Sequence, residues 1–581
     1  MPLLLEHTRT CRLGTLVLVF NLFLLSGLLS GCSNDNNATI YTAQAIITMN
    51  PQQPRAEAIA VLNGKIEAVG DLATVTAAVA HHNPQVDRSF QGKAILPGFI
   101  EPHLHPYLAG ILLPMEFITP HDWDMPGKQA KGVRGRDAYL EQLKNADQKL
   151  GSDEWLWTWG YHPYFHGELT RADLDQISTQ RPIVVWHRSF HEIIVNTAVL
   201  NELELEDTAH PQVNFAEGHF YENGLYQLVP HIMPMLTSPF RYLGALRHAR
   251  DIIHAGGVTT VSDGAFGTMD FDKEWLSMRF SSWNRSSSPF RFMVLADGKG
   301  LGKQMGHEQA KAFIKTLPEK NTGKVTFLPR QVKLFADGAA YSQLMQMRDG
   351  YLDGHHGEWL MTPDELETTA RLYWRDDFQI HIHVNGDLGL DATLDIIEKL
   401  QREYPRKDHR TTVHHLAYAR PEQAQRMAHL GVRVSANPYY VWALADKYAE
   451  VGLGPERAHH MVPLKSVVDA GVPLSFHSDF TMAPVQPLLL AWAAATRLTA
   501  EGRVVGADQR ISLDDALKSI TLDAASQLRM EDSIGSLSVG KNADFTILEQ
   551  DPYTQPIERL KDIPVWGTVL EGKKQPIAAD L

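Results

Sequence analysis

Short apolar runs alternate with amphipathic stretches through the middle of the chain. Eight runs have the length and composition of buried strands, and most are followed by a helical pattern such as residues 362–376. In that stretch Thr362 predicts the N-cap and Pro363 the first helical turn. This alternation predicts an α/β fold of right-handed βαβ units, and eight strands predict a closed (β/α)8 TIM-like barrel over residues 96–534. The eight runs begin at Ala94, Gly257, Phe290, Gln331, Gln379, Thr411, Gly431 and Gly471.

Residues 106–250 interrupt this alternation after the first run. The stretch is too long for a loop and has strand-like runs of its own, at residues 155–161 and 182–190. We therefore expect an inserted subdomain over the barrel mouth. Four tryptophans in these runs either wall an apolar pocket or belong to the core. They are Trp155, Trp157, Trp159 and Trp186.

Both ends of the chain show the same pattern of short strand-like runs separated by tight turns. Asn63-Gly64 between two apolar runs is a hairpin signal, and similar runs follow residue 535. Neither end is long enough to close a sheet alone. We expect residues 38–95 and 535–581 to pair into one composite β-sandwich. Two independent hairpins that cap the core are the alternative.

The first 31 residues have the pattern of an export signal. Arg9 and Arg12 precede an apolar run from Leu16 to Leu29, and small residues and Cys32 follow at once. The sequence Leu-Ser-Gly-Cys that ends at Cys32 resembles the lipobox of bacterial lipoproteins, which implies cleavage before Cys32 and lipid attachment to its thiol. An uncleaved N-terminal anchor helix is the alternative.

Residues 32–37 then form a lipidated cysteine and a short polar tether. This arrangement predicts an exported protein that is lipid-anchored to a bacterial membrane, on its periplasmic or cell-surface side, with no other membrane contact. Ser33 after the cysteine resembles the signal for sorting to the outer membrane.

Composition excludes several classes of protein. The 581 residues carry a formal net charge of −14. We therefore do not expect the basic surface that nucleic-acid binding requires. Two cysteines exclude a disulfide scaffold and a cysteine-rich zinc site. The chain has 27 histidines, so we expect any metal site to consist of histidine, carboxylate and lysine ligands.

Several of the predicted strands end in histidine, where a strand buried on both faces should be apolar. His103 and His105 point to the same side, about 6–7 Å apart at the backbone, so both can reach one metal. In the fifth run His383 lies nearer the strand end than His381, which makes His383 the favoured ligand. In the sixth run His414 and His415 are adjacent, and alternation does not choose between them.

Lys333 and Asp479 are the other polar residues at strand ends. A lysine inside an apolar strand is costly unless it is paired or chemically changed. Lys333 is therefore either one half of a buried ion pair, for instance with Asp337, or a carbamate that bridges two metals. Asp479 is either a helix N-cap or a carboxylate that takes a proton from an activated water and returns it to a leaving group.

Six segments in this order resemble the amidohydrolase superfamily, specifically the amidohydrolase-3, YtcJ-like branch that includes N-substituted formamide deformylases. The segments are ILPGFIEPHLH, VKLFADG, HVNGD, VHHL, HSD and SIGSLSVGKNADFTIL. The resemblance implies a metal-dependent (β/α)8 barrel with a composite β-sandwich. It implies His103, His105, Lys333, His383, His415 and Asp479 as metal ligands, with Lys333 open to carbamylation and Asp479 also catalytic.

The resemblance also covers residues 187–200, where His191 matches a substrate-side histidine; a scaffold histidine is the alternative. Four residues depart from the family pattern around the site. They are Glu101, His414, Asn437 and His477.

The predicted function is hydrolysis of a non-peptide carbon–nitrogen bond in a small molecule, with one or two divalent ions, of which Zn²⁺ is expected. A lipid-tethered binding or scaffold protein that keeps only the barrel is one alternative. A deaminase or a lactone or ester hydrolase on the same site is another. A homodimer is compatible with these expectations.

Overall fold

The computed structural model describes residues 37–578. The predicted signal peptide and the predicted lipid-attachment site Cys32 lie outside the described residues. Within residues 37–578, none of the helices combines the length and the apolar character needed to cross a membrane.

Eight parallel strands form the centre of the molecule, and each pairs with the next strand in chain order. Every one overlaps one of the eight predicted runs, so the prediction of a TIM-like barrel is confirmed. Its strands are β5 (Phe99–Leu104), β14 (Val258–Phe266), β15 (Arg291–Asp297), β16 (Val325–Phe335), β17 (Gln379–Val384), β18 (Thr412–His415), β19 (Arg433–Ala436) and β20 (Leu474–Phe476).

The ring is closed between β5 and the segment that follows β20. Asp479 donates its backbone N–H to the carbonyl of His103 at 3.2 Å, and His105 donates to the carbonyl of Phe480 at 3.0 Å. These bonds continue the barrel where the ladder between β20 and β5 is absent from the described pairings. The closure therefore joins the two segments that carry His103, His105 and Asp479.

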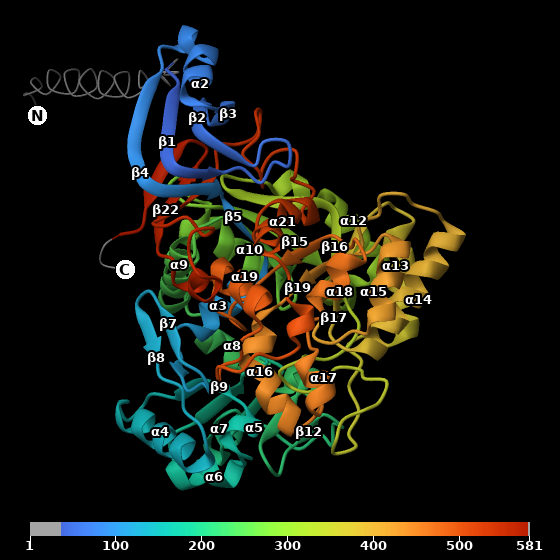
Figure 1. Ribbon diagram of the computed structural model, residues 1–581. Coiled ribbons are helices and arrows are strands. Elements are labelled where there is room, and N and C mark those ends of the chain that lie inside the picture. The colour runs from blue at the N-terminus through green and yellow to red at the C-terminus, as the bar shows by residue number, and fades with distance from the viewer. Residues whose placement is uncertain (1–36, 579–581) are drawn as a thin grey trace, which may run out of the picture.

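Helices cover the outside of the barrel (Figure 1). In α13 (Pro363–Trp374), Thr362 accepts the backbone N–H of Glu365, and Glu365 accepts that of Thr362 at 2.9 Å, so the predicted start is a capping box. The buried face of α13 includes Leu366 and Trp374. Further helices of the ring are α10 (Phe271–Phe280), α11 (Gly298–Met305), α14 (Asp387–Glu403), α15 (Pro421–Leu430), α18 (Leu464–Asp469) and α19 (Pro487–Thr496).

Strands from both chain ends form one seven-stranded sheet, at the top of Figure 1. The ends meet where β4 pairs antiparallel with β21, which two independent hairpins would not do. The arrangement of these strands as the two packed layers of a sandwich stays a prediction. In order across the sheet they are β23 (Lys573–Pro576), β22 (Val565–Leu570), β21 (Phe545–Leu548), β4 (Gln85–Pro97), β1 (Thr39–Ile47), β2 (Arg55–Leu62) and β3 (Lys65–Gly70).

Gly98 connects this sheet to the barrel, between β4 and β5. A Cβ at this position would lie 2.1 Å from Oγ1 of Thr259 on β14, so glycine leaves the room that the Thr259 side chain occupies. The sheet and the first barrel strand are thus continuous.

Residues 106–250 contain a six-stranded sheet of their own, which lies beyond the other end of the barrel (Figure 1). It packs against α4 (Arg136–Gln148), α6 (Arg171–Ile177) and α7 (Thr197–Glu202). In order, the sheet consists of β12 (Val213–Asn214), β13 (His219–Tyr221), β11 (Glu192–Val195), β10 (Ile183–His187), β9 (Leu156–Tyr161) and β6 (Glu116–Phe117).

Candidate metal centre

The end of β5 and the turn after β20 bring together a first group of metal-ligand atoms. His103 Nε2 lies 3.3 Å from His105 Nε2, and Asp479 Oδ1 lies 3.5 Å and 3.2 Å from these two nitrogens. The backbone of Asp479 has a φ of +56°, a left-handed conformation that non-glycine residues seldom adopt. Such strain is typical of functional positions, and here it holds a carboxylate beside two imidazoles.

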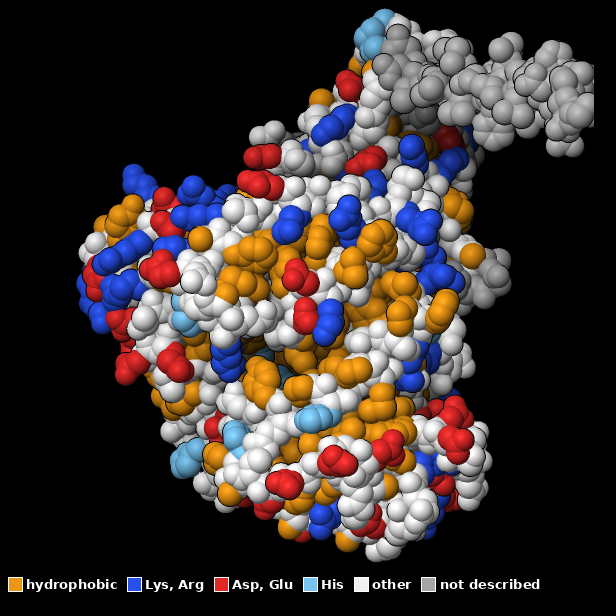
Figure 2. Space-filling model, turned by 180° about the vertical axis from the view of Figure 1, so that it is seen from behind, with side chains coloured by type: hydrophobic (Ala, Val, Ile, Leu, Met, Phe, Trp, Pro, Cys, Tyr) orange, Lys and Arg blue, Asp and Glu red, His pale blue; other side chains and the backbone are white. Residues whose placement is uncertain are grey.

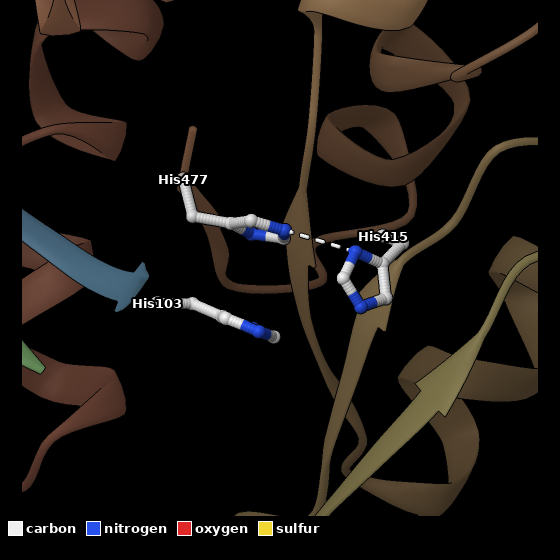
Figure 3. A group of neighbouring side chains, drawn as sticks. All are labelled: His103, His415 and His477. Carbon is white, nitrogen blue, oxygen red and sulfur yellow. Dashed lines mark hydrogen bonds between the residues drawn. The ribbon is translucent and has the colours of Figure 1, made fainter. Parts of the chain in front are cut away.

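His415 and His477 form a second group with the same His103, which the sticks of Figure 3 show. His477 Nε2 lies 3.1 Å from His415 Nδ1, and the His103 and His477 rings stack at a centroid distance of 4.6 Å. The other ring nitrogen of His477 is hydrogen-bonded to the hydroxyl of Ser435 at 2.8 Å. Nε2 of His415 is buried and has no hydrogen-bond partner among the described residues.

Asp479 also links the two groups, because its Oδ2 lies 3.7 Å from His415 Nδ1. His415 has a left-handed backbone as well, with a φ of +79°. The side chains of residues 103, 105, 415, 477 and 479 therefore converge at one end of the barrel, as a shared cation would require.

His383 and Lys333 lie next to these groups, although neither belongs to them. The His383 ring is 4.3 Å from the His415 ring, centroid to centroid, and Asn385 Nδ2 donates a hydrogen bond to His383 Nε2 at 2.9 Å. Lys333 Nζ is buried and has neither a hydrogen bond nor an ion pair among residues 37–578. Burial lowers the pKa of Lys333 to about 7.

The alternative of a Lys333–Asp337 ion pair is wrong. Asp337 instead accepts the backbone N–H groups of Gln346, Asn385 and Gly386, at 2.8 to 2.9 Å. This carboxylate fixes the loops above the barrel, and Lys333 is left without a counter-ion in the described structure.

His414 and His381 lie behind the convergent ligands in a chain of hydrogen bonds. His414 Nδ1 is 2.6 Å from His103 Nδ1, and its Nε2 is 2.9 Å from His381 Nδ1. His381 Nε2 is in turn 2.9 Å from Gln331 Oε1. This chain fixes the ring of His103, and it leaves Nε2 of His103 free to face His105 and Asp479.

Electrostatics favour a cation at the centre. Burial, reinforced by Lys333, holds the pKa values of His103 and His414 well below the usual value of 6.5. Burial has the same effect on His383 and His415, so these imidazoles are neutral. Burial also opposes a charge on His105, but Asp263 and Asp479 outweigh it and raise the pKa of His105 to about 9.

These residues fit a divalent ion. Neutral imidazoles with a carboxylate are a common donor set for Zn²⁺. The unpartnered nitrogens of His415 and Lys333 are buried polar atoms that would otherwise be destabilising.

A cavity of about 230 Å³ lies between the barrel end and the insertion, and His105 and Asp263 are among its walls. Figure 2 shows a face of the molecule on which hydrophobic side chains surround a hollow. His191 lines the cavity, and its Nδ1 is 2.9 Å from Oε2 of Glu222, whose other oxygen is buried without a partner among the described residues. Burial opposes a charge on His191, but Glu222 outweighs it and raises the pKa of His191.

Of the four tryptophans singled out in the sequence, two belong to the core, and one of these two also lines the cavity. Trp159 and Trp186 are buried, and Trp186 is also a cavity wall. Trp155 and Trp157 stack on each other at 5.0 Å, away from the cavity.

The other three residues that depart from the family pattern also have defined contacts. Glu101 is buried and accepts the backbone N–H of Ser478. Asn437 donates to the Ser478 carbonyl at 3.2 Å. His477 joins the second ligand group, which sequence reasoning missed. Asp263 was also missed, although a carboxylate in the fully buried strand β14 was a usable signal.

A family model described as the amidohydrolase family matches residues 90–574. The chain belongs to the amidohydrolase family. It is 26% identical to Protein LONG AFTER FAR-RED 3 of Arabidopsis thaliana, over 93% of this chain and 90% of that protein. It is 24% identical to the N-substituted formamide deformylase of Arthrobacter pascens, over 90% of this chain and 96% of that protein.

The fold of this amidohydrolase is also found in a solved structure. An uncharacterized metal-dependent hydrolase from Pyrococcus horikoshii matches with a TM-score of 0.67 and 21% identity, over 90% of this chain and 99% of that one.

Proposed function

We propose that this amidohydrolase is an enzyme that hydrolyses a carbon–nitrogen bond of amide type in a non-peptide small molecule. The observation that carries the proposal is the position of Asp479, whose two carboxylate oxygens face His105 and His415. The family match and the hydrolases among its relatives support the same activity.

One ion would be held by His103, His105 and Asp479. A second would be held by His383 and His415, with Lys333 as a ligand if its amine has reacted with CO₂ to form a carbamate and release a proton. A bound divalent ion supplies a Lewis acid, which activates water and polarises a carbonyl oxygen.

Asp479 is the proposed general base and acid. Its carboxylate accepts a proton from the water that attacks the carbonyl carbon. As the carbon–nitrogen bond breaks, the same group delivers that proton to the departing nitrogen. The products are a carboxylic acid and an amine, and Asp479 returns to its ionised form.

His191 is the proposed substrate-positioning residue. Glu222 fixes its Nδ1, so that the other ring nitrogen can face a substrate in the cavity. Apolar walls such as Trp186 and Phe335 exclude bulk water, which strengthens hydrogen bonds and charge interactions inside the cavity.

The test is a hydrolysis screen on protein purified without chelators and reconstituted with Zn²⁺. The panel contains N-formyl, N-acyl and cyclic amides, together with lactones, esters and amino-heterocycles that report the alternative activities. We expect bound metal and turnover of at least one amide class. Metal-free protein, or turnover confined to esters or amino-heterocycles, would contradict the proposal.

We also propose that the protein is exported and anchored through a lipid on Cys32. The support is the run of residues 1–32. Radiolabelled palmitate should enter the wild-type protein and should not enter a Cys32→Ser variant, which should leave the membrane fraction. Equal labelling of both proteins would exclude Cys32 as the acceptor.

A further inference from the structure

The cavity beside the metal centre is mainly apolar, with a few charged side chains. Most of these charges are tied to the backbone around them. Asp297 accepts the N–H groups of Lys299 and Gly300 and the hydroxyl of Thr268, at 2.8 to 2.9 Å. Glu274 accepts the N–H groups of Gly267 and Met269. These carboxylates therefore have their hydrogen bonds within the fold.

Lys299 is different, because its ammonium has no fixed partner. The residue is half-buried in the first turn of α11, and its Nζ lies 5.6 Å from the ring centroid of Phe335, another cavity wall. It has no ion pair within 4.0 Å among residues 37–578. An ammonium that loses water without gaining a counter-ion is destabilising, and burial lowers the pKa of Lys299 accordingly.

A second lysine lies close to Lys299, beside the rim of the cavity. Lys303 lies one helical turn beyond Lys299 on α11, and its Nζ is 5.0 Å from the ring centroid of Tyr226, which also lines the cavity. Both cations belong to a chain with a net charge of −14. Asp297 and Glu222 offset part of this charge, but neither forms an ion pair with Lys299 among the described residues, so the ammonium stays available to an anionic ligand.

The cavity has room for an apolar group as well as an anion. An apolar cavity of about 150 Å³ accommodates benzene, and this one measures about 230 Å³. Phe335 lies equally close to Lys299 and to the metal-site Lys333, since its ring centroid is 5.6 Å from each Nζ. The Phe335 ring would thus lie between an anion bound at Lys299 and Lys333 of the metal centre.

We propose that Lys299 binds a carboxylate of the substrate, so that the cavity selects amides with an apolar body and one anionic group at the far end. This inference rests on the proposed hydrolase function only where it calls the ligand a substrate. The anion site itself is argued from the residues that line the cavity. Lys299 is a specificity residue here, and its backbone N–H, which donates to the capping carboxylate of Asp297, is unaffected by side-chain substitution.

A binding experiment tests the anion site without turnover. Calorimetry on the Zn²⁺-loaded protein compares 4-phenylbutyrate with the uncharged 4-phenylbutyramide. We expect the affinity ratio of acid to amide to fall by about tenfold or more in Lys299→Met, because a charge-assisted hydrogen bond is lost. Any contribution from carboxylate binding to the metal is common to both proteins and cancels in this comparison.

Two matched variants complete the design. Lys299→Arg should keep most of the ratio, and Lys144→Met, at an exposed position on α4, should keep all of it. An unchanged ratio in Lys299→Met, an equal loss of affinity for both ligands, or wild-type protein that does not prefer the acid would each overturn the proposal.

A kinetic experiment then separates the two proposals. The substrates are N-formyl-4-(aminomethyl)benzoic acid and its methyl ester, which share the formamide and differ only in the distant charge. Lys299→Met should raise KM for the acid by about tenfold with little change in kcat, and should leave the ester unaffected. If no amide is hydrolysed but the binding ratio still depends on Lys299, the hydrolase proposal fails and the anion site stands.

Discussion

Glu101 on β5 accepts the backbone N–H of Ser478 through both carboxylate oxygens, at 3.0 and 3.1 Å. Ser478 precedes Asp479, so this contact joins the first barrel strand to the residue proposed to transfer protons. Glu101 also precedes His103 by two positions and accepts its N–H at 3.4 Å. Closure of the barrel and the geometry of the metal centre therefore depend on the same buried side chain.

Glu101→Ala should lower both stability and activity. The variant leaves the buried N–H of Ser478 without an acceptor, which costs about 1–3 kcal/mol in the free energy of unfolding. Denaturant unfolding followed by circular dichroism measures the loss. Glu67→Ala, at an exposed position on β3, is the control and should unfold like the wild type. Identical unfolding midpoints for all three proteins would show that the Glu101–Ser478 contact does not stabilise the fold.

Asp479→Asn should abolish most turnover while the protein stays folded and metal-loaded through its histidines. Loss of a general base lowers kcat by about 10²–10⁴-fold. Asp263→Asn is the comparison variant, because Asp263 faces the other nitrogen of His105 at 3.7 Å and is not the proposed general base. We expect a loss of about 10–100-fold for this variant. Full activity of Asp479→Asn in a kcat measurement would remove Asp479 from the mechanism.

Metal removal should destabilise the protein, because an ion that binds only the folded state adds to its stability. At a free metal concentration 100 times the Kd, the contribution is about 2.7 kcal/mol. Differential scanning calorimetry should record a lower Tm after chelation and recovery on addition of Zn²⁺. The double variant His103→Ala/His105→Ala should show no recovery. If chelator leaves the Tm of Zn²⁺-reconstituted wild-type protein unchanged, the result would argue against a bound ion.

The insertion should lose stability in mild acid. Burial lowers the pKa of His121 and His166 to about 3, and that of His187 to about 4. In the unfolded chain histidine has a pKa of about 6.5, so below that pH the unfolded state binds more protons and the free energy of unfolding falls. The loss is about 1.4 kcal/mol for each histidine by pH 5.5.

His121→Phe isolates one of these groups. The ring of His121 packs against Phe165 at 5.3 Å and Trp442 at 5.0 Å, so phenylalanine preserves the aromatic contacts. Thermal unfolding measures the loss of stability between pH 7.5 and 5.5. In this variant the loss should be smaller by the contribution of one histidine, about 1.4 kcal/mol. His81→Phe, at an exposed position, should match the wild type. Parallel curves for all three proteins would exclude His121 as a source of acid sensitivity.

Local patterns predicted the barrel because each strand is defined by its own residues. The apolar runs locate the barrel strands β5 and β14 to β20. Thr362 and Glu365, three residues apart, set the start of α13. His103 and His105 could be paired from the alternation of a strand alone.

Residues that depend on the tertiary arrangement were harder to predict. Strand alternation did not choose between His414 and His415, and the structure gives both a role, because the backbone turns left-handed at His415. Glu222 opens a short 3-10 helix of the insertion and Lys299 lies in α11 of the barrel, and both line the cavity between these two parts. No periodic pattern in the sequence encodes that arrangement.

The β4–β21 ladder has a consequence for biosynthesis. The first strands of the sheet leave the ribosome before the barrel, but the partner of β4 starts at Phe545, after the last barrel strand. Until then β4 presents an open edge that invites pairing with other chains. Completion of this sheet therefore waits for synthesis of the whole barrel, and chains terminated before Phe545 should aggregate or depend on chaperones.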